Sequence, residues 1–201
     1  MISIPRTLGI LLVVASGCKV SSVEPMTFPA TYRPEGAAGA VTVAPACAVV
    51  HELDVVDGRS DKSLVGARSI QDKDARSDVL IEGDIEAWLR AAISRGLVQG
   101  HFPQEEGADL DLRFELESIQ IDEVAYRNST YEGRVILGVE IVNSTTGDAI
   151  WSHRADGVST NYGRPGNPTN YQETINHALD RAVARALNEP ALRDALCAES
   201  P

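Results

Sequence analysis

The chain has 201 residues and a formal net charge of −11, from 29 acidic and 18 basic side chains. Nucleic-acid phosphates repel such an acidic chain, and no run of basic residues offsets the charge, so we expect no nucleic-acid partner. For the same reason we expect the chain to be repelled by anionic lipid headgroups, so any membrane contact needs another source.

The first 18 residues carry the pattern of an export signal. Arg6 precedes an apolar stretch, residues 8–15, which is too short to span a membrane. Small residues lead from it directly to Cys18, an order typical of a bacterial lipobox, in which the cysteine thiol is acylated. The pattern predicts a signal peptide over residues 1–17 and a covalent lipid, with palmitate among its acyl chains, on Cys18.

A lipid on Cys18 would decide where the mature protein resides. Two or more acyl chains hold a protein stably on a bilayer, whereas one chain holds it only weakly. Lys19 follows the cysteine, and the absence of Asp at that position favours the outer membrane. We therefore expect a protein anchored to the periplasmic face of the outer membrane.

The segment after the anchor differs in composition from the rest of the chain. Residues 18–46 are rich in proline and glycine and lack helical periodicity, which predicts a flexible tether, with a possible edge strand over residues 40–43. Residues 47–201 then form a single periplasmic domain. Cys47 and Cys197 open and close it, and in an oxidising compartment they form a candidate disulfide, the alternative being two separate thiols.

The first half of the domain predicts one strand and one helix. Residues 48–56 are rich in valine and alternate, which indicates a strand that ends at a turn. Residues 59–76 are mostly polar and suggest a loop. Ser77 or Asp78 is then a candidate N-cap for a helix whose apolar stripe runs to a C-cap at Gly96.

The second half predicts three strands and a helix. Residues 110–116 alternate strictly, and the pattern changes phase at Ser118, where we expect a bulge. Residues 134–142 and 149–158 are expected to form an antiparallel hairpin. A loop over residues 160–170, with Thr169 or Asn170 as the cap, leads to a helix over residues 171–188. A short last turn starts at Pro190.

The element order β-α-β-β-β-α predicts an α+β fold. Each expected helix has one apolar stripe, and the hairpin strands have one apolar face. A two-layer sandwich, with two helices packed on one face of a largely antiparallel sheet, would bury all of these surfaces. The opposite face of the sheet would then stay open to water or to a partner.

The chain resembles the YajG-like family of bacterial lipoproteins. The resemblance is carried by the lipobox around Cys18, by residues 55–61 with the step 64–66 after them, and by the order of the helix through Trp88, the strand over 109–116 and the helix over 170–187. It covers most of the mature chain, but none of its motifs is a catalytic signature. It implies a location and a fold, and no functional residues carry over from it.

One candidate binding cluster lies in the turn after the first strand. Asp57, Arg59 and Asp61 could bind a cation or a polar ligand there. The alternative, which we favour, is a turn in which the aspartates accept bonds from backbone amides and Arg59 pairs locally. The spacing lacks the ligand ladder of a calcium loop.

Four acids on one strand raise the possibility of catalysis. Asp109, Asp111, Glu115 and Glu117 alternate with apolar residues, and residues two apart in a strand stand about 6.6 to 6.8 Å from each other. Inverting glycosidases use a similar separation, although Arg113 lies among these acids and a wet strand face needs charge in any case. The four histidines show no metal-ligand spacing, so we expect no metal and no cofactor.

The best candidate for a partner surface is the loop that contains Tyr162 and Arg164. Its composition suggests mobility, and both residue types are common anchors at interfaces. We therefore expect a non-catalytic accessory module that binds an envelope protein. A carrier of an apolar ligand stays open as an alternative, as does, less favoured, a glycan hydrolase that uses the strand acids.

Overall fold

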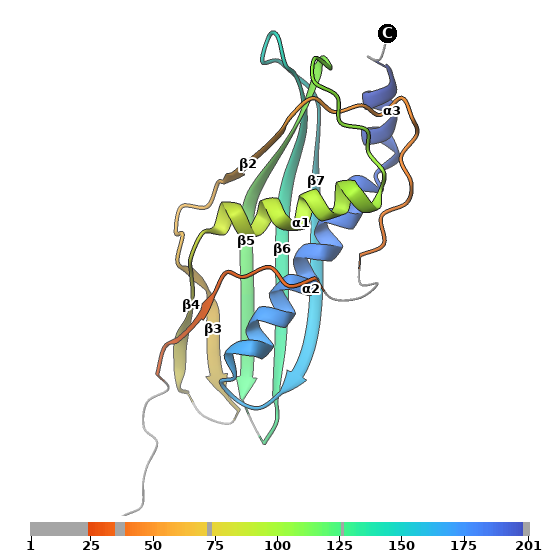
Figure 1. The fold of residues 1–201 in the computed structure, drawn as a ribbon. Helices are drawn as coiled ribbons and strands as arrows, with labels where there is room; N and C mark the ends of the chain where they lie inside the picture. Colours follow the sequence, from red (N-terminus) through yellow and green to blue (C-terminus); the bar gives the residue numbers. More distant parts are fainter. Residues whose placement is uncertain (1–23, 35–38, 72–73, 126, 199–201) are drawn as a thin grey trace, which may run out of the picture.

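The computed structural model describes residues 24–34, 39–71, 74–125 and 127–198. The predicted signal peptide and Cys18 lie outside these residues. Within them the chain forms a seven-stranded sheet in the order β1-β4-β3-β5-β6-β7, with β2 paired to β5 (Figure 1). The strands are β1 (Met26–Pro29), β2 (Leu53–Asp57), β3 (Leu64–Ile70), β4 (Arg76–Glu82), β5 (Leu110–Ala125), β6 (Ser129–Asn143) and β7 (Ala149–Gly163). The helices are α1 (Ile85–Gln99), α2 (Pro168–Leu187) and α3 (Pro190–Ala198).

The α+β class is confirmed, but the sheet is mixed rather than largely antiparallel. β5 accounts for the difference, because it is long enough to take two parallel neighbours on the same edge. β2 pairs with its first half, from Leu112 to Leu116, and β3 pairs with its second half, from Ile121 to Ala125. The predicted two-helix arrangement also gains a third helix, since the segment from Pro190 forms α3 and buries Leu192 and Leu196.

The centre of the sheet follows the predicted pattern. β5, β6 and β7 form an antiparallel meander, and the hairpin between β6 and β7 is confirmed. The register between β5 and β6 shifts between Leu116 and Ser118, as the change of phase predicted. The bulge lets Phe114 before it and Ile121 after it point into the same core, where both are fully buried.

The predicted polar loop and the predicted start of the first helix are wrong. Residues 64–70 form β3, and Ser77 and Asp78 lie within β4 rather than at a helix cap. The buried residues Val79 and Ile81 alternate there, which is the strand period. α1 starts later, where the Asp84 side chain accepts a 2.9 Å bond from the amide of Ala87.

Gly96 does not end α1, which continues to Gln99. The glycine lies in the helix interior, where an added Cβ would come within 2.7 Å of Val183 Cγ1 on α2. It therefore permits the close approach of the two helices.

α2 lies directly on the sheet. Its predicted apolar stripe is buried, but it begins at Pro168 with Asn167 as the cap, so the expected loop over residues 160–170 shrinks to a short connection. At Gly157 of β7, an added Cβ would stand 2.0 Å from the carbonyl oxygen of Ala178. Helix and strand backbones therefore touch here, which leaves no room for a ligand between them.

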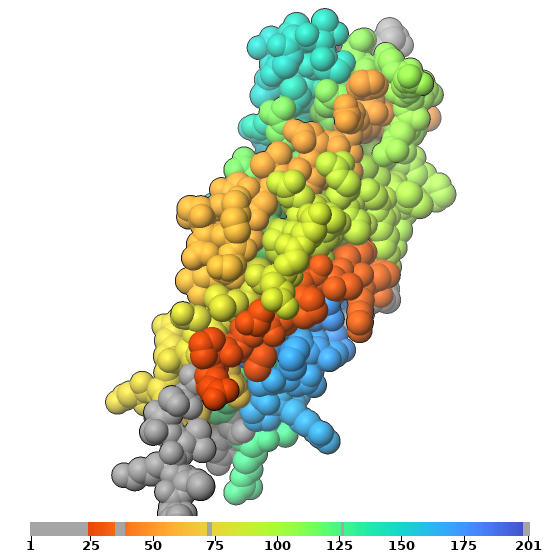
Figure 2. All heavy atoms as spheres, turned by 60° about the vertical axis from the view of Figure 1, so that its left-hand side comes forward, coloured from red at the N-terminus to blue at the C-terminus, as the bar shows by residue number. Residues whose placement is uncertain are grey.

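The predicted tether contains an ordered segment that packs across the helices. We call residues 26–34 and 39–50 the N-terminal strap; Figure 2 shows its first part lying between α1 and α2. The expected edge strand over residues 40–43 does not form; β1 pairs with β4 instead and buries Phe28 completely.

Polar side chains at four-residue spacing along α2 hold the strap. Gln172 and Asn176 donate to the carbonyl of Thr31, Asp180 accepts the Tyr32 hydroxyl at 2.5 Å, and Asn188 at the C-cap binds the backbone of residues 40 and 42. These side chains lie on one face of the helix because residues four apart are neighbours there. A segment without periodicity of its own is thus fixed by a helix far away in sequence.

Candidate functional site

One face of the sheet is covered by helices and the other is open. α1 and α2 lie on the same side of the sheet (Figure 1). On the opposite side, which we call the open face, β5, β6 and β7 present mostly polar side chains that are exposed or half-exposed. These include Arg113, Glu115, Glu117, Gln120, Asp122, Glu132, Arg134, Glu140, Ser152, Arg154 and Asp156.

Ion pairs between strands cross the open face. Arg154 Nε lies 2.5 Å from Glu117 Oε2, across β7, β6 and β5. Arg113 lies between Asp54 and Glu140, at 3.0 and 3.6 Å. Exposed pairs of this kind contribute about 1 kcal/mol or less each, so they order the surface more than they stabilise the fold.

A hollow of about 350 Å³ opens on this face at Gly138. Gly138 has no side chain, so Glu117 and Arg154 can meet above the strand. Ligand pockets for small molecules are mostly apolar with a few polar groups, whereas charged side chains dominate this lining. The hollow is therefore better suited to contact with the polar surface of a partner than to binding a small buried ligand.

Three of the four strand acids lie on β5, as the alternation predicted, and two of them pair with basic groups. Asp111 Oδ1 lies 2.9 Å from His51 Nδ1, and Glu117 pairs with Arg154. Glu115 packs against Gly58, and Asp109 lies in the loop before β5. Three acids, Glu115, Glu117 and Glu140, line one open hollow on this face, but arginines pair with Glu117 and Glu140 there.

The Asp57 turn matches the structural alternative. Arg59 donates two 2.9 Å bonds, from Nε and Nη2, to the two oxygens of Asp57, and both residues are buried. Burial raises the pKa of Asp57, but the bonds from Arg59 outweigh it and leave the pKa lowered. Asp61 accepts from the amides of Ser63 and Leu64, which lower its pKa. The turn thus satisfies most of its own polar groups, although Arg59 Nη1 is buried without a hydrogen-bond partner.

Tyr162 and Arg164 lie at the end of β7, in a connection that is held rather than loose. Tyr162 is still in the strand, points to the open face and is 72% exposed. The Arg164 side chain is exposed, but its carbonyl oxygen accepts bonds from the hydroxyl of Tyr131 and the amide of Asn170. Buried groups beneath the connection therefore bind its backbone, whereas its composition suggested a mobile loop.

A buried cluster around Glu123 holds this end of the sheet, and the sequence analysis missed it. Glu123 is 1% exposed; Ser129 Oγ donates to its Oε1 at 2.5 Å, the amide of Gly166 donates to the same oxygen at 2.8 Å, and Arg68 Nε lies 2.6 Å from Oε2. The Tyr171 hydroxyl donates to Oε2 as well. We call these five residues the Glu123 cluster; it joins β3, β5, β6, α2 and the connection between β7 and α2.

The cluster keeps Glu123 ionised and Tyr171 neutral. Burial raises the pKa of Glu123, but the bonds from Ser129, Tyr171 and Gly166 outweigh it, so the pKa is lowered. Burial and the bond to Glu123 raise the pKa of Tyr171. A sequence signal for the cluster existed, since Glu123 falls on the buried phase set by Ile119 and Ile121.

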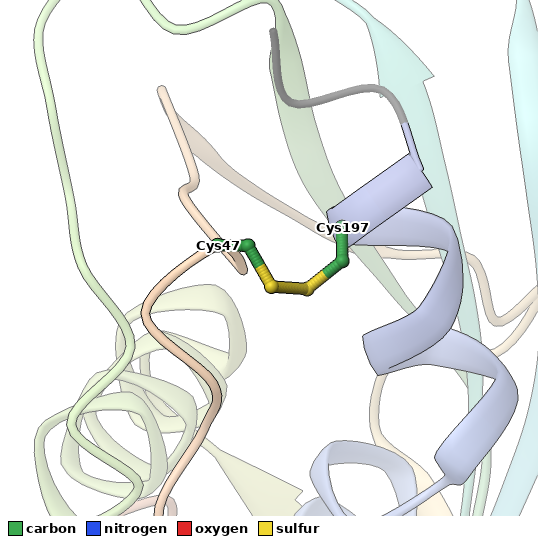
Figure 3. The surroundings of a disulfide bond; sticks show 2 residues. All are labelled: Cys47 and Cys197. Atoms are coloured by element: carbon green, nitrogen blue, oxygen red, sulfur yellow. A yellow bond between two sulfur atoms is a disulfide. The ribbon is translucent and has the colours of Figure 1, made fainter.

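Cys47 and Cys197 form a disulfide, as the sequence allowed (Figure 3). Their Cα atoms are 4.9 Å apart, although 150 positions separate them in sequence. The bond joins the end of the N-terminal strap to α3. It therefore ties α3, the last helix, to the part of the strap that precedes β2.

Metal sites and membrane-spanning helices are two further features that the described residues could contain. No group of three or more His, Cys, Asp or Glu side chains there is placed to hold a metal ion. None of the helices in that part of the chain is long and apolar enough to cross a membrane.

Comparison with known proteins relates the chain to others by fold. No family model matches the sequence. No curated protein matches it either. A Xanthomonas campestris protein of the family DUF330 has a similar structure, with a TM-score of 0.53 and 11% identity over 84% of this chain and 96% of that one.

Weaker likenesses extend to two other bacterial proteins. A candidate haemagglutinin homologue from Helicobacter pylori has a TM-score of 0.42 at 11% identity, over 85% of this chain and 99% of that one. A candidate lipoprotein from Caulobacter crescentus has a TM-score of 0.39 at 17% identity, over 59% of this chain and 87% of that one. At these identities only the fold of the first is informative: the chain shares the fold of the Xanthomonas protein.

Proposed function

We propose that this protein is a lipoprotein of the outer membrane, anchored through Cys18, whose folded domain is a non-catalytic accessory module for an envelope protein. The order of charge, apolar stretch, small residues and cysteine in residues 6–18 supports the anchor. The disulfide between Cys47 and Cys197 supports export, because such bonds persist in oxidising compartments. The resemblance to the YajG-like family agrees with the same location.

The open face carries the proposal of a binding module. A sheet face of three long strands is left without a covering layer, while the opposite face is closed by α1 and α2. Its arginines and acids are already paired across strands, which supplies both signs of charge for recognition. Complementary charges on such a face steer the encounter with a partner and fix its register more than they add affinity.

The same observations make the two alternatives less suitable. Glycan hydrolysis would require two carboxylates placed on either side of a bound sugar, whereas Glu117 and Asp111 are each paired with a basic residue. A carrier would require space between helices and sheet, where Gly157 of β7 instead meets the backbone of α2.

Photocrosslinking in intact envelopes tests the binding module. A photoreactive residue at Ser152 on the open face is compared with one at Val98, which is 75% exposed on α1 and lies off that face. We expect a discrete crosslinked product from position 152 and none from position 98, and we expect Arg154→Glu to reduce it. Equal crosslinking from both positions, or no effect of Arg154→Glu, would contradict docking on the open face.

A further inference from the structure

The two ends of the sheet differ in charge. At one end lie the turn between β3 and β4, the turn between β5 and β6 and the connection from β7 to α2. We call this the turn end and define it by its exposed side chains Arg76, Val124, Arg127, Tyr162 and Arg164; the exposed acid Asp74 also lies in the turn between β3 and β4. Within the described part of the chain, none of these three arginines pairs with an acid, whereas Arg68, Arg113 and Arg154 do.

The opposite end, which we call the far end, is acidic. It comprises the loop 103–109 before β5 and the turn 144–148 between β6 and β7, which meet where the amide of Ser144 donates to the carbonyl of Asp109. These two segments contain no Lys or Arg. Their acids are Glu105, Glu106, Asp109 and Asp148. The turn end thus carries three exposed arginines that pair with no acid among the described residues, while the charged side chains of these two far-end segments are all acidic.

Two exposed apolar or aromatic side chains, Val124 and Tyr162, also lie at the turn end. Val124 of β5 pairs with Thr130 of β6, which in turn pairs with Tyr162 of β7, so the three side chains form a row across the open face. Val124 is 48% and Tyr162 is 72% exposed. A tyrosine combines an apolar ring with a polar tip and is enriched where membrane meets water.

The N-terminal chain leaves the domain at the turn end. β1 runs parallel to β4, with Met26 beside Val79, so the chain before it points toward the start of β4 at Arg76. Figure 1 shows β1 beginning at the end of the molecule where β5 and β7 finish. Cys18 precedes Glu24 by six positions, a reach of at most about 20 Å. The sheet is longer, since the 15 residues of β6 extend about 50 Å.

We propose that the turn end rests on the membrane surface, with Tyr162 and Val124 in the headgroup region and Arg76, Arg127 and Arg164 at the phosphates of anionic lipids. The inference rests on the proposed anchor at Cys18. Guanidinium groups bind phosphate oxygens through paired hydrogen bonds, and each basic residue near an anionic surface adds attraction. The far end, being acidic, is repelled and points away. The composition suggested that the net charge of −11 repels the chain from anionic lipids. In this arrangement the repulsion acts on the far end, and the turn end still contacts the bilayer.

The arrangement assigns a direction to the open face. With the turn end on the bilayer, β5, β6 and β7 stand away from the membrane, and the hollow at Gly138 lies beyond the first rows of the sheet. A partner would then approach from the side, parallel to the membrane.

Tryptophan quenching by brominated lipids tests the orientation. The full-length lipidated protein is reconstituted in vesicles of phosphatidylethanolamine and phosphatidylglycerol as Tyr162→Trp or as the matched variant Ile150→Trp. Ile150 is exposed on the same strand near the far end, about 40 Å away. The fluorescence of the native Trp88 and Trp151 is measured in the unmodified protein and subtracted from that of each variant. We expect the added tryptophan at position 162 to be quenched about threefold more than the one at position 150.

A charge-reversed variant separates the arginines from the tether. Arg76→Glu, Arg127→Glu and Arg164→Glu are combined with each tryptophan variant, and we expect the quenching ratio to fall toward one. Equal quenching at both positions, or a ratio unchanged by charge reversal, would overturn the inference. Palmitate labelling of the same samples distinguishes the two failures: labelled protein without the quenching difference refutes only the orientation, whereas unlabelled protein refutes the proposed anchor.

Discussion

The turn end and the far end of this molecule are fastened by different chemistry. At the turn end, the Glu123 cluster joins three strands, a helix and a connection through charged hydrogen bonds in a buried site. Toward the far end, one covalent bond between Cys47 and Cys197 joins the strap to α3. The comparison shows that a noncovalent cluster orders the end proposed to meet the membrane, while a covalent bond fastens α3 to the strap toward the far end.

Removing the disulfide has the largest expected effect. Cys47→Ser with Cys197→Ser opens a loop of 150 positions and should lower the free energy of unfolding by up to about 5 kcal/mol, because the unfolded chain regains its freedom. Urea denaturation measures the change. The control is the unmodified protein with a reducing agent, which should lose as much. An equal stability of oxidised and reduced protein would show that the bond does not stabilise the domain.

Glu123→Ala tests the Glu123 cluster and should lower the free energy of unfolding by about 3 kcal/mol. The substitution leaves Arg68 buried beside an empty acceptor position, which is the costly way to break a buried pair. The matched control is Glu132→Ala on the open face, where an exposed acid should change stability by less than about 0.5 kcal/mol. Similar small effects of both substitutions would mean that the cluster does not hold the turn end.

Gly157→Ala tests the contact between β7 and α2, in the middle of the molecule, and should lower the free energy of unfolding by about 2 kcal/mol. The new methyl group would meet the carbonyl oxygen of Ala178, so α2 has to move off the sheet. Gly138→Ala on the opposite face meets only the flexible Glu117 side chain and should be nearly neutral. The midpoint of thermal unfolding is measured for both variants. If Gly157→Ala unfolds no earlier than Gly138→Ala, helix and strand are not in close contact.

Acid should weaken the turn end and leave the disulfide untouched. Because the pKa of Glu123 is lowered in the folded state, its ionised form stabilises the fold above the ordinary value of 4.5, and this contribution is lost as the pH falls through the lower folded pKa. The stability difference between the unmodified protein and Glu123→Gln should therefore narrow at acid pH. A difference that stays constant from neutral to strongly acid pH would contradict an ionised Glu123.

The same comparison shows how far the sequence could lead. The disulfide was accessible because an export signal and an even pair of cysteines constrain each other. The bulge at Ser118 and the β6–β7 hairpin followed from period-two alternation. These features depend on local pattern or simple counting, which a single sequence contains.

The missed features depend on contacts between distant segments. β3 and β4 are polar enough to resemble a loop and form only because β5 and β1 flank them. The strap has no periodicity of its own and is held by Gln172 and Asn176 of α2, whose polar side chains gave no sign of burial. The sequence pattern did not single out Glu123, because most acids of the same strand occupy exposed positions.

The most direct measurement is metabolic labelling with palmitate, followed by separation of inner and outer membranes. The account predicts that the unmodified protein is labelled and fractionates with the outer membrane, that Cys18→Ser is unlabelled and soluble, and that Cys47→Ser with Cys197→Ser is still labelled. An unlabelled native protein, or a Cys18→Ser variant that still sediments with membranes, would contradict the anchor and the orientation built on it.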